Sequence, residues 1–194
     1  MKDLAYRVVP VVAALPAASA TLAGVVVRLS TDNRAYWCDG TVWVDLNADS
    51  RLSIARLAAD VTNSTTTLAN ASGLAIAMDA NATYGVAVRL LFQTAAANTG
   101  IRLTQTAPTG ASVFAQWSTP TSLTANTVSN QRAVDAGTAT NSIDTANATT
   151  MATAEILVIN GPTAGNLQIR FASEVAASNA VLKAGSHIVS HKIV

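Results

Sequence analysis

The sequence has little charge and almost no cysteine or histidine. Lys and Arg number 12 and Asp and Glu 11, so charged residues make up 12% of the 194-residue chain and the formal net charge is +1. No basic run occurs, which argues against nucleic-acid binding, because that binding needs Lys and Arg to neutralise phosphates. Cys38 is the only cysteine. A disulfide framework within the chain and a Cys-based zinc site are therefore excluded.

Long apolar runs are also missing. No segment approaches the roughly 20 apolar residues that span a bilayer, so we expect no membrane insertion. An apolar stretch over residues 8–18 follows Lys2 and Arg7 and ends in an A-x-A pattern, which imitates an export signal. Asp3 precedes this stretch and two prolines interrupt it. We therefore expect no functional signal peptide.

The sequence offers little for catalysis. No G-x-S-x-G elbow, P-loop, dinucleotide fingerprint or H-E-x-x-H motif occurs. His187 and His191 are the only histidines, and on a strand they would share a face, so a metal pair is one interpretation. Lys183 and Lys192 make their surroundings basic, which favours two exposed surface histidines instead. We predict a non-enzymatic protein with no catalytic residue, no metal site and no cofactor.

Polar loop residues have a simple explanation as turn formers. Oxygen ligands for calcium are available at Asp79, Asn81, Asp144 and Asn147, but their spacing is not that of a calcium loop. Side-chain hydrogen bonds within turns explain them without an ion. Four N-x-S/T sequences, at Asn63, Asn70, Asn81 and Asn147, are likewise interpreted as turns rather than as glycosylation acceptors.

What the chain does contain is typical of β-structure. Hydrophobic residues make up 50% of the chain, and about a fifth of all residues are alanine, with abundant Thr, Ser and Asn. Residues 25–29, 34–38 and 41–46 predict three short strands. Asp39-Gly40 lies between the last two and predicts a type I′ hairpin turn. Tyr36, Trp37 and Trp43 concentrate in this hairpin. We therefore predict a small β-meander over residues 1–48.

Residues 49–62 fit two patterns. Asp49 and Ser50 can cap a helix. Alternation of Leu57, Ala59 and Val61 favours a strand instead. We treat 49–62 as a connector with a first strand and leave its secondary structure open.

From residue 63 onward, β-like runs alternate with turn-rich clusters. The expected strands cover residues 74–78, 84–93, 101–106, 112–117, 132–135, 151–160, 167–174 and 180–194, the last with a bend at Gly185. The expected turns include residues 118–122 and 141–150. Many strands without intervening helices predict an antiparallel, jelly-roll-like β-sandwich over residues 63–194. The chain is thus expected to be all-β.

Individual residues refine this picture. Val86, Val88, Leu90 and Phe92 form one fully apolar face of their strand, while the other face carries Arg89 but also Leu91. That second face indicates partial burial against another element or another subunit. Cys38 is expected to be a small buried hydrophobe. Trp117 is expected to anchor the core, with a carbohydrate-stacking platform as the alternative.

Three stretches resemble a known group of proteins. The first runs from Pro16 through G-V-V-V-R-L to the T-D-N-R-A-Y-W-C-D-G-T-V-W-V sequence at residues 31–44. It resembles a small β-motif of tailed-bacteriophage fibre and virion surface proteins. Residues 59–68 through 99–103, together with 169–175 and 183–186, resemble the C-terminal β-sandwich domains of these proteins.

The resemblance implies a non-enzymatic virion component, usually trimeric, with a small anchor and an outward β-sandwich. The short chain lacks shaft repeats, so we expect a capsid decoration (cement) or head-fibre protein. It would be made in the host cytoplasm and bind the major capsid protein and copies of itself on the outer surface of the virion. The alternatives are a short tail fibre or tail tip that binds a host surface glycan, and a cellular lectin-like module.

Overall fold

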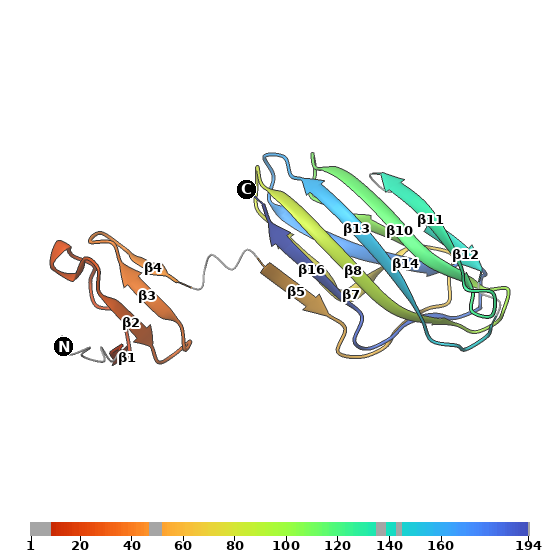
Figure 1. Cartoon of the computed structure of the whole chain (residues 1–194), viewed down its shortest axis with the longest axis horizontal. Helices are drawn as coiled ribbons and strands as arrows, with labels where there is room; N and C mark the ends of the chain where they lie inside the picture. The colour runs from red at the N-terminus through yellow and green to blue at the C-terminus, as the bar shows by residue number, and fades with distance from the viewer. Residues whose placement is uncertain (1–8, 47–51, 135–138, 143–144, 194) are drawn as a thin grey trace, which may run out of the picture. The chain divides into compact units, whose positions relative to one another are not determined.

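The chain folds as two β-rich units. The computed structural model describes residues 9–46, 52–134, 139–142 and 145–193 (Figure 1). Contacts divide it into Met1–Ser50 and Arg51–Val194. Within the described ranges almost all regular structure is strand, apart from the single 3-10 turn at Ala20–Leu22. The all-β fold expected from the sequence is confirmed.

The first unit is a small sheet in the order β1-β2-β3-β4. Its strands are β1 (Val11–Val12), β2 (Val26–Leu29), β3 (Ala35–Cys38) and β4 (Trp43–Asp45). Antiparallel pairing of β2, β3 and β4 confirms the meander. Strand β1 was not expected; it adds in parallel to β2, with Val11 opposite Arg28.

The hairpin turn differs from the expected type I′. Gly40 has φ +104°, but Asp39 is not among the residues with positive φ. The Asp39 N–H donates to the Val42 carbonyl, so the two loop residues are Gly40 and Thr41. Asp39 instead accepts hydrogen bonds on Oδ1 from the backbone N–H groups of Thr41 and Val42, at 2.7 and 2.8 Å. The carboxylate therefore stabilises the turn from one residue before the loop, and only glycine needs the left-handed conformation.

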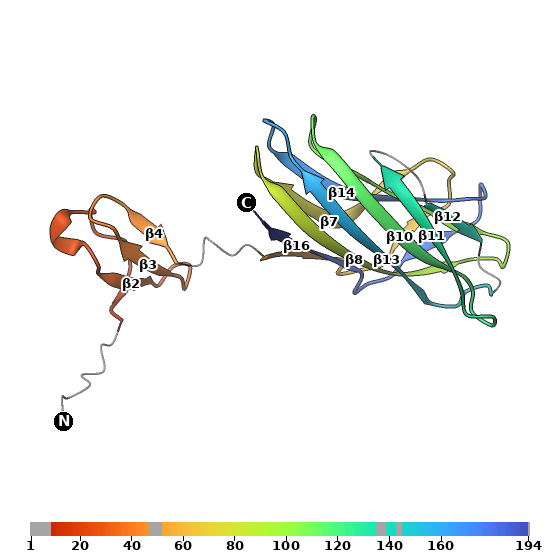
Figure 2. The same cartoon turned by 45° about the horizontal axis from the view of Figure 1, so that its top comes forward.

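The second unit is a sandwich of two sheets (Figure 2). The larger sheet has the order β11-β10-β13-β8-β15-β6, and β16 pairs with both β8 and β5. The smaller sheet has the order β12-β9-β14-β7. The larger sheet contains β5 (Leu52–Arg56), β6 (Val61–Asn63), β8 (Thr83–Thr94), β10 (Ser112–Ser122), β11 (Thr127–Val134), β13 (Thr150–Ile159), β15 (Ala180–Leu182) and β16 (His187–Lys192). The smaller contains β7 (Ala69–Met78), β9 (Gly100–Thr106), β12 (Ala139–Ser142) and β14 (Gly165–Ser173).

The chain crosses from one sheet to the other at most connections, the exceptions being β5–β6, β10–β11 and β15–β16. Strands β7, β8 and β9 alternate between the sheets, and so do β12, β13, β14 and β16. This alternation over two four-stranded sets, β5-β16-β8-β13 and β7-β14-β9-β12, is the strand order of a jelly roll. The β10–β11 hairpin is inserted between β9 and β12 and extends the larger sheet beyond β13.

Several expected boundaries were wrong. The residues expected as a connector supply β5 and β6, and β5 pairs antiparallel with β16, so the sandwich begins before residue 63. Residues 118–122 are not a turn but the end of β10. Thr119 is buried there, and the pairing with β11 continues beyond a register shift after Pro120. Strand β12 includes the first residues of the expected 141–150 turn. The expected bend at Gly185 is confirmed, because φ of +93° there separates β15 from β16.

The sandwich core confirms the alternating pattern of the central strand. Val86, Val88, Leu90 and Phe92 of β8 are at most 2% exposed. Trp117 is fully buried in the same core, and its Nε1 donates to Gln105 Oε1 at 3.1 Å across the two sheets. Trp117 is thus a core anchor and not a stacking platform on the surface.

We predict that Trp117→Phe destabilises the sandwich by about 2 kcal/mol, because it removes ring volume and leaves the Gln105 amide oxygen buried without its donor. Urea unfolding followed by circular dichroism measures this. The matched control Trp37→Phe, at a half-exposed position of the small unit, should change the free energy of unfolding of the sandwich by less than about 0.5 kcal/mol. Equal midpoints for the two variants would contradict the assignment.

Two carboxylates hold strands of the sandwich from the outside. Lys183 Nζ and the Ala184 N–H both donate to Asp60, next to the β15–β16 turn. Lys192 Nζ donates to Asp79 at 3.0 Å, and Tyr84 donates to the same carboxylate. The bond from Lys183 is the main cause that lowers the pKa of Asp60 below 3.8, and the bond from Lys192 does the same for Asp79.

These lowered pKa values predict how stability depends on pH. The unfolded chain binds protons more readily than the folded one at these carboxylates. Their contribution to stability is therefore complete above the ordinary carboxyl pKa and is lost as the pH falls through the lowered pKa values. Asp60→Asn should make this acid-side loss shallower. Urea midpoints measured from pH 7 down to pH 2.5 test it, and an unchanged pH profile in the variant would contradict it.

Candidate interaction surfaces

The outer face of the larger sheet is the first candidate site. Inward residues of β8, β13 and β10 fill the core, so the alternate residues point to solvent. Two cross-strand rows follow from the register. One runs Ile54, Val189, Ala87, Glu155, Gln116, Arg132, and the next runs Leu52, His191, Gly85, Leu157, Phe114. We call this surface the outer face.

Large apolar side chains concentrate on the outer face. The described part of the sandwich has nine exposed large hydrophobic residues, and seven of them lie on the outer face. Val175 and Ile193 are the two that lie outside it. The seven are Leu52, Ile54, Phe114, Val128, Met151, Leu157 and Ile159. Single exposed apolar side chains are ordinary on a protein surface, but several on one sheet face indicate an interaction site.

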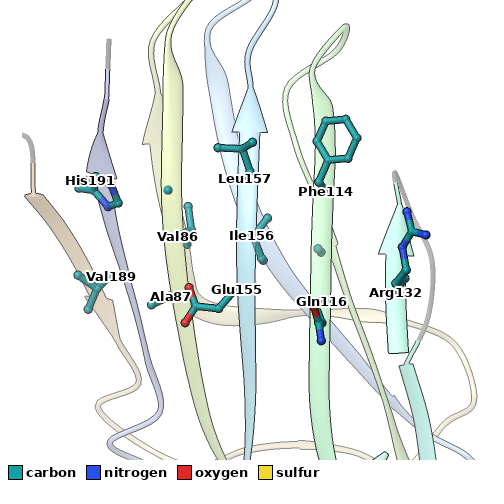
Figure 3. A pocket seen from close by; sticks show the side chains of 12 residues that line it. Val86, Ala87, Phe114, Gln116, Arg132, Glu155, Ile156, Leu157, Val189 and His191 are labelled. Atoms are coloured by element: carbon teal, nitrogen blue, oxygen red, sulfur yellow. The ribbon is translucent and has the colours of Figure 1, made fainter. Parts of the chain in front are cut away.

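A groove of about 520 Å³ crosses this face (Figure 3). Gly85 and Ala87 form part of its lining, with Leu157 and Phe114 on one side and Val189 and His191 on the other. The His191 ring lies directly over Gly85: a Cβ on Gly85 would overlap His191 Cε1 and stand 3.0 Å from Nε2. The hollow therefore exists because small residues of β8 lie between strands that carry large ones.

Polar side chains line one end of the same groove. Glu155 on β13 and Gln116 on β10 are directly opposite each other, and Arg132 on β11 is opposite Gln116. Glu155 and Arg132 are exposed. Among the described residues neither has an ion-pair partner. The groove thus combines an apolar lining with one carboxylate and one guanidinium.

The outer surface of the small sheet is the second candidate site. Only Val27 and Cys38 of its described hydrophobic residues are buried, as expected for Cys38. Trp37 pairs across the strands with Val26 and Val44, so these three side chains share the face that is opposite to buried Val27 and Cys38. The exposed large hydrophobic residues of this unit are Val9, Val11, Trp37, Val42, Val44 and Leu46. Trp37 and Val44 form the centre of what we call the small-sheet face.

Three charged side chains of the small unit, Asp32, Arg34 and Asp45, have partners within the unit. Arg34 pairs with Asp45 at 2.7 Å, and Tyr36 donates to Asp32 at 2.6 Å. The bond from Tyr36 is the main cause that lowers the pKa of Asp32, and the bond to Asp45 is the main cause that raises the pKa of Arg34. The small-sheet face can therefore be covered without burying any of these charges unpaired.

The structure places the residues singled out from the sequence as follows. His187 and His191 both lie on β16 and face outward; His187 Nδ1 is 3.0 Å from the Gly185 carbonyl, while His191 lines the groove. No group of three His, Cys, Asp or Glu side chains suited to a metal occurs among the described residues. Asn81 and Asn147 have positive φ, as turn residues do. Asp144 lies outside the described residues.

The outer face was only partly foreseen. The occurrence of Leu91 beside Arg89 on the second side of β8 indicated this face, and Leu91 is indeed half-buried there. The contributions of Phe114 and Leu157 were missed. One signal was available: Ile156 to Ile159 are four consecutive apolar residues, so both sides of β13 are apolar.

Comparisons with known proteins add little to this geometry. No protein-family model matches the chain, and no curated protein does. Among solved structures, the Eiger TNF of S. frugiperda is 11% identical over 74% of this chain and 92% of that one, with a TM-score of 0.38. A VP2 subviral particle of infectious bursal disease virus is 8% identical over 78% of this chain and 42% of that one, with a TM-score of 0.21. At these values the likenesses carry no argument about function.

None of the helices within the described ranges is long and apolar enough to cross a bilayer.

We predict that Gly85→Ala changes the groove but not the stability of the sandwich. The new Cβ displaces only the end of the His191 side chain, so the free energy of unfolding, measured with urea, should change by less than about 1 kcal/mol. Proton NMR of the His191 ring should show shifted resonances, whereas Ala87→Gly leaves them nearly unchanged. A variant that fails to fold would contradict the placement of the ring.

Proposed function

We propose that this chain is a non-enzymatic structural protein of a tailed-bacteriophage virion, a capsid decoration or head-fibre protein that binds the outer capsid surface and stabilises it as a trimer. The observation that carries the proposal is the pair of uncovered apolar faces, one on each unit. A protein with two such faces can join two partners at once. The sequence resemblance to virion surface proteins supports the capsid as one of those partners.

The small unit is the natural anchor in this proposal. Small units bury only a modest share of their surface on folding and are correspondingly marginal in stability. This unit, Met1–Ser50, buries only Val27 and Cys38 among its described hydrophobic residues. Docking the small-sheet face on the capsid would bury Trp37 and Val44 and complete the core that the unit lacks. Many copies, each contributing a modest contact, would add their binding energies around the particle.

A second candidate is a short tail fibre or tail tip that binds a host surface polysaccharide. The groove favours it, because the exposed Phe114 ring lies beside Gln116, Glu155 and Arg132. An aromatic face flanked by hydrogen-bonding side chains is a common arrangement for a sugar ring. The two candidates differ in copy number and in position on the particle.

Location on purified particles tests the proposal. We expect quantitative mass spectrometry and labelled antibody to find hundreds of copies on the head. Particles that lack the protein should break at lower temperature or lower osmotic shock. A few copies at the tail, with saturable binding to host cells, would favour the second candidate. Absence from particles would refute both.

A pair of matched variants tests the anchor. Val44→Asp places a charge on the small-sheet face and should lower occupancy on the capsid at least about tenfold, because docking would bury an unpaired carboxylate. Val175→Asp makes the same change at an equally exposed valine outside both faces and should bind as the parent does. Equal occupancy of the two variants, measured on particles decorated in vitro, would contradict an anchor at this face.

A further inference from the structure

A third cross-strand row of the outer face carries positive charge. Arg56 on β5 lies opposite His187 on β16, and His187 lies opposite Arg89 on β8. Both arginines are exposed, and they stand about 10 Å apart at the backbone with the histidine strand between them. The three residues are far apart in the sequence, so only the register of the larger sheet brings them together. We call them the cationic row.

The side chains of the cationic row are suited to carboxylates. The His187 Nδ1 is 3.0 Å from the Gly185 carbonyl oxygen. A carbonyl can only accept, so Nδ1 carries the hydrogen and a ligand would meet Nε2. The guanidinium groups on either side can only donate, and they match the planar fork of a carboxylate. An anionic group above the row would therefore meet donors from three neighbouring strands.

Positive charge exceeds negative charge on the outer face. Arg132 adds a third arginine, and Glu155 is the one carboxylate at the outward positions of the described strands of this sheet. None of these four charged side chains forms an ion pair within the described ranges. Glu155 stands diagonally across from Arg89 and can neutralise one arginine. At least two arginines are left for a partner, so the partner that complements this face is acidic.

Apolar side chains border the cationic row on both sides. In one direction along the strands the next outward residues are Ile54, Val189 and Ala87, at the edge of the groove (Figure 3). In the other direction they are Leu91 and Met151. A polysaccharide or a nucleic acid has no aliphatic side chains to cover such residues, whereas a segment of protein has. Charge and apolar surface together favour an acidic protein segment.

We propose that the outer face binds an acidic segment of a partner protein, with carboxylates of that segment over the cationic row and an apolar side chain in the groove beside Phe114. This deepens the proposed function, on which it rests only for placing the partner on the virion. The chemistry of the partner follows from the excess of arginine and from the apolar residues on both sides of the row.

Two synthetic peptides test the charge of the partner on the full-length chain. One alternates glutamate with leucine and phenylalanine, and the other has glutamine in place of every glutamate. Fluorescence anisotropy should give at least about tenfold tighter binding of the acidic peptide, and this difference should shrink as salt is added. Equal binding of the two peptides, or no binding of either at millimolar concentration, would overturn the proposal.

Charge exchange locates the binding on the chain. Arg56→Glu and Arg89→Glu should each weaken the acidic peptide about tenfold, because each places like charges in contact. The double variant R56E/R89E should instead prefer a peptide with lysine in place of glutamate. Arg28→Glu makes the same change at an exposed arginine of the small unit and should stay within about twofold of the parent. An equal loss with Arg28→Glu, or no change of preference in the double variant, would overturn the surface.

Phe114→Ser and an acidic polysaccharide separate a protein partner from a sugar. Phe114 is 51% exposed, so the variant should fold, as thermal unfolding of all variants checks. It should weaken the acidic peptide about tenfold and leave the salt dependence unchanged. Alginate, which has carboxylates but no apolar side chains, should bind at least about tenfold more weakly than the peptide. Alginate binding as tight as that of the peptide would overturn the protein partner and favour the second candidate function.

The outcomes separate this proposal from the proposed function, because the peptides are measured on the isolated chain. Absence of the protein from particles, together with the full charge-exchange pattern, would refute the proposed function and support the acidic partner. Many copies on the head, together with no preference for the acidic peptide, would refute the acidic partner alone.

Discussion

The register of strand β8 is the constraint on which the rest of the sandwich depends. β8 pairs with β13 on one side and with β15 and β16 on the other, so it fixes the position of all three. Because side chains alternate along a strand, a slip of one residue would send Val86, Val88 and Leu90 to solvent and bring Arg89 into the core. The same register places Gly85 and Ala87 between the larger residues of the neighbouring strands, so the core and the groove have one cause.

Much of the fold could be predicted from local pattern. The alternation in β8 and the absence of helical segments were sufficient for an all-β sandwich, and the order of turns and strands was sufficient for the meander. Boundaries were less predictable where turn-forming residues lie in strands. Residues 118–122 contain Ser, Thr and Pro, but pairing with β11 buries Thr119 and keeps the strand extended. Whether such residues form a turn or a strand depends on pairing partners that are distant in sequence, and local composition carries no information about those partners.

The candidate surfaces were harder to predict for a related reason. A residue on an outer face belongs to it through its cross-strand neighbours, and these come from β5, β8, β10, β13 and β16, spread over most of the chain. Leu91 gave a hint within one strand. The groove, by contrast, depends on Gly85 lying beside His191, which is 106 positions later in the chain. No spacing rule connects these two residues before the sheet order is known.

The low charge of the chain and the small core of its first unit both bear on association with a partner. Each charge on a contact surface must be paired or desolvated on association, so a chain with 12% charged residues can cover large areas at little electrostatic cost. The small unit pairs Arg34 with Asp45 and leaves Val42, Val44 and Trp37 exposed, so much of its apolar surface is not covered within the unit. The sandwich has a complete core and still exposes seven large hydrophobic side chains on one sheet. In the proposed assembly this apolar area would be removed from water, which would favour the assembled state over the isolated chain.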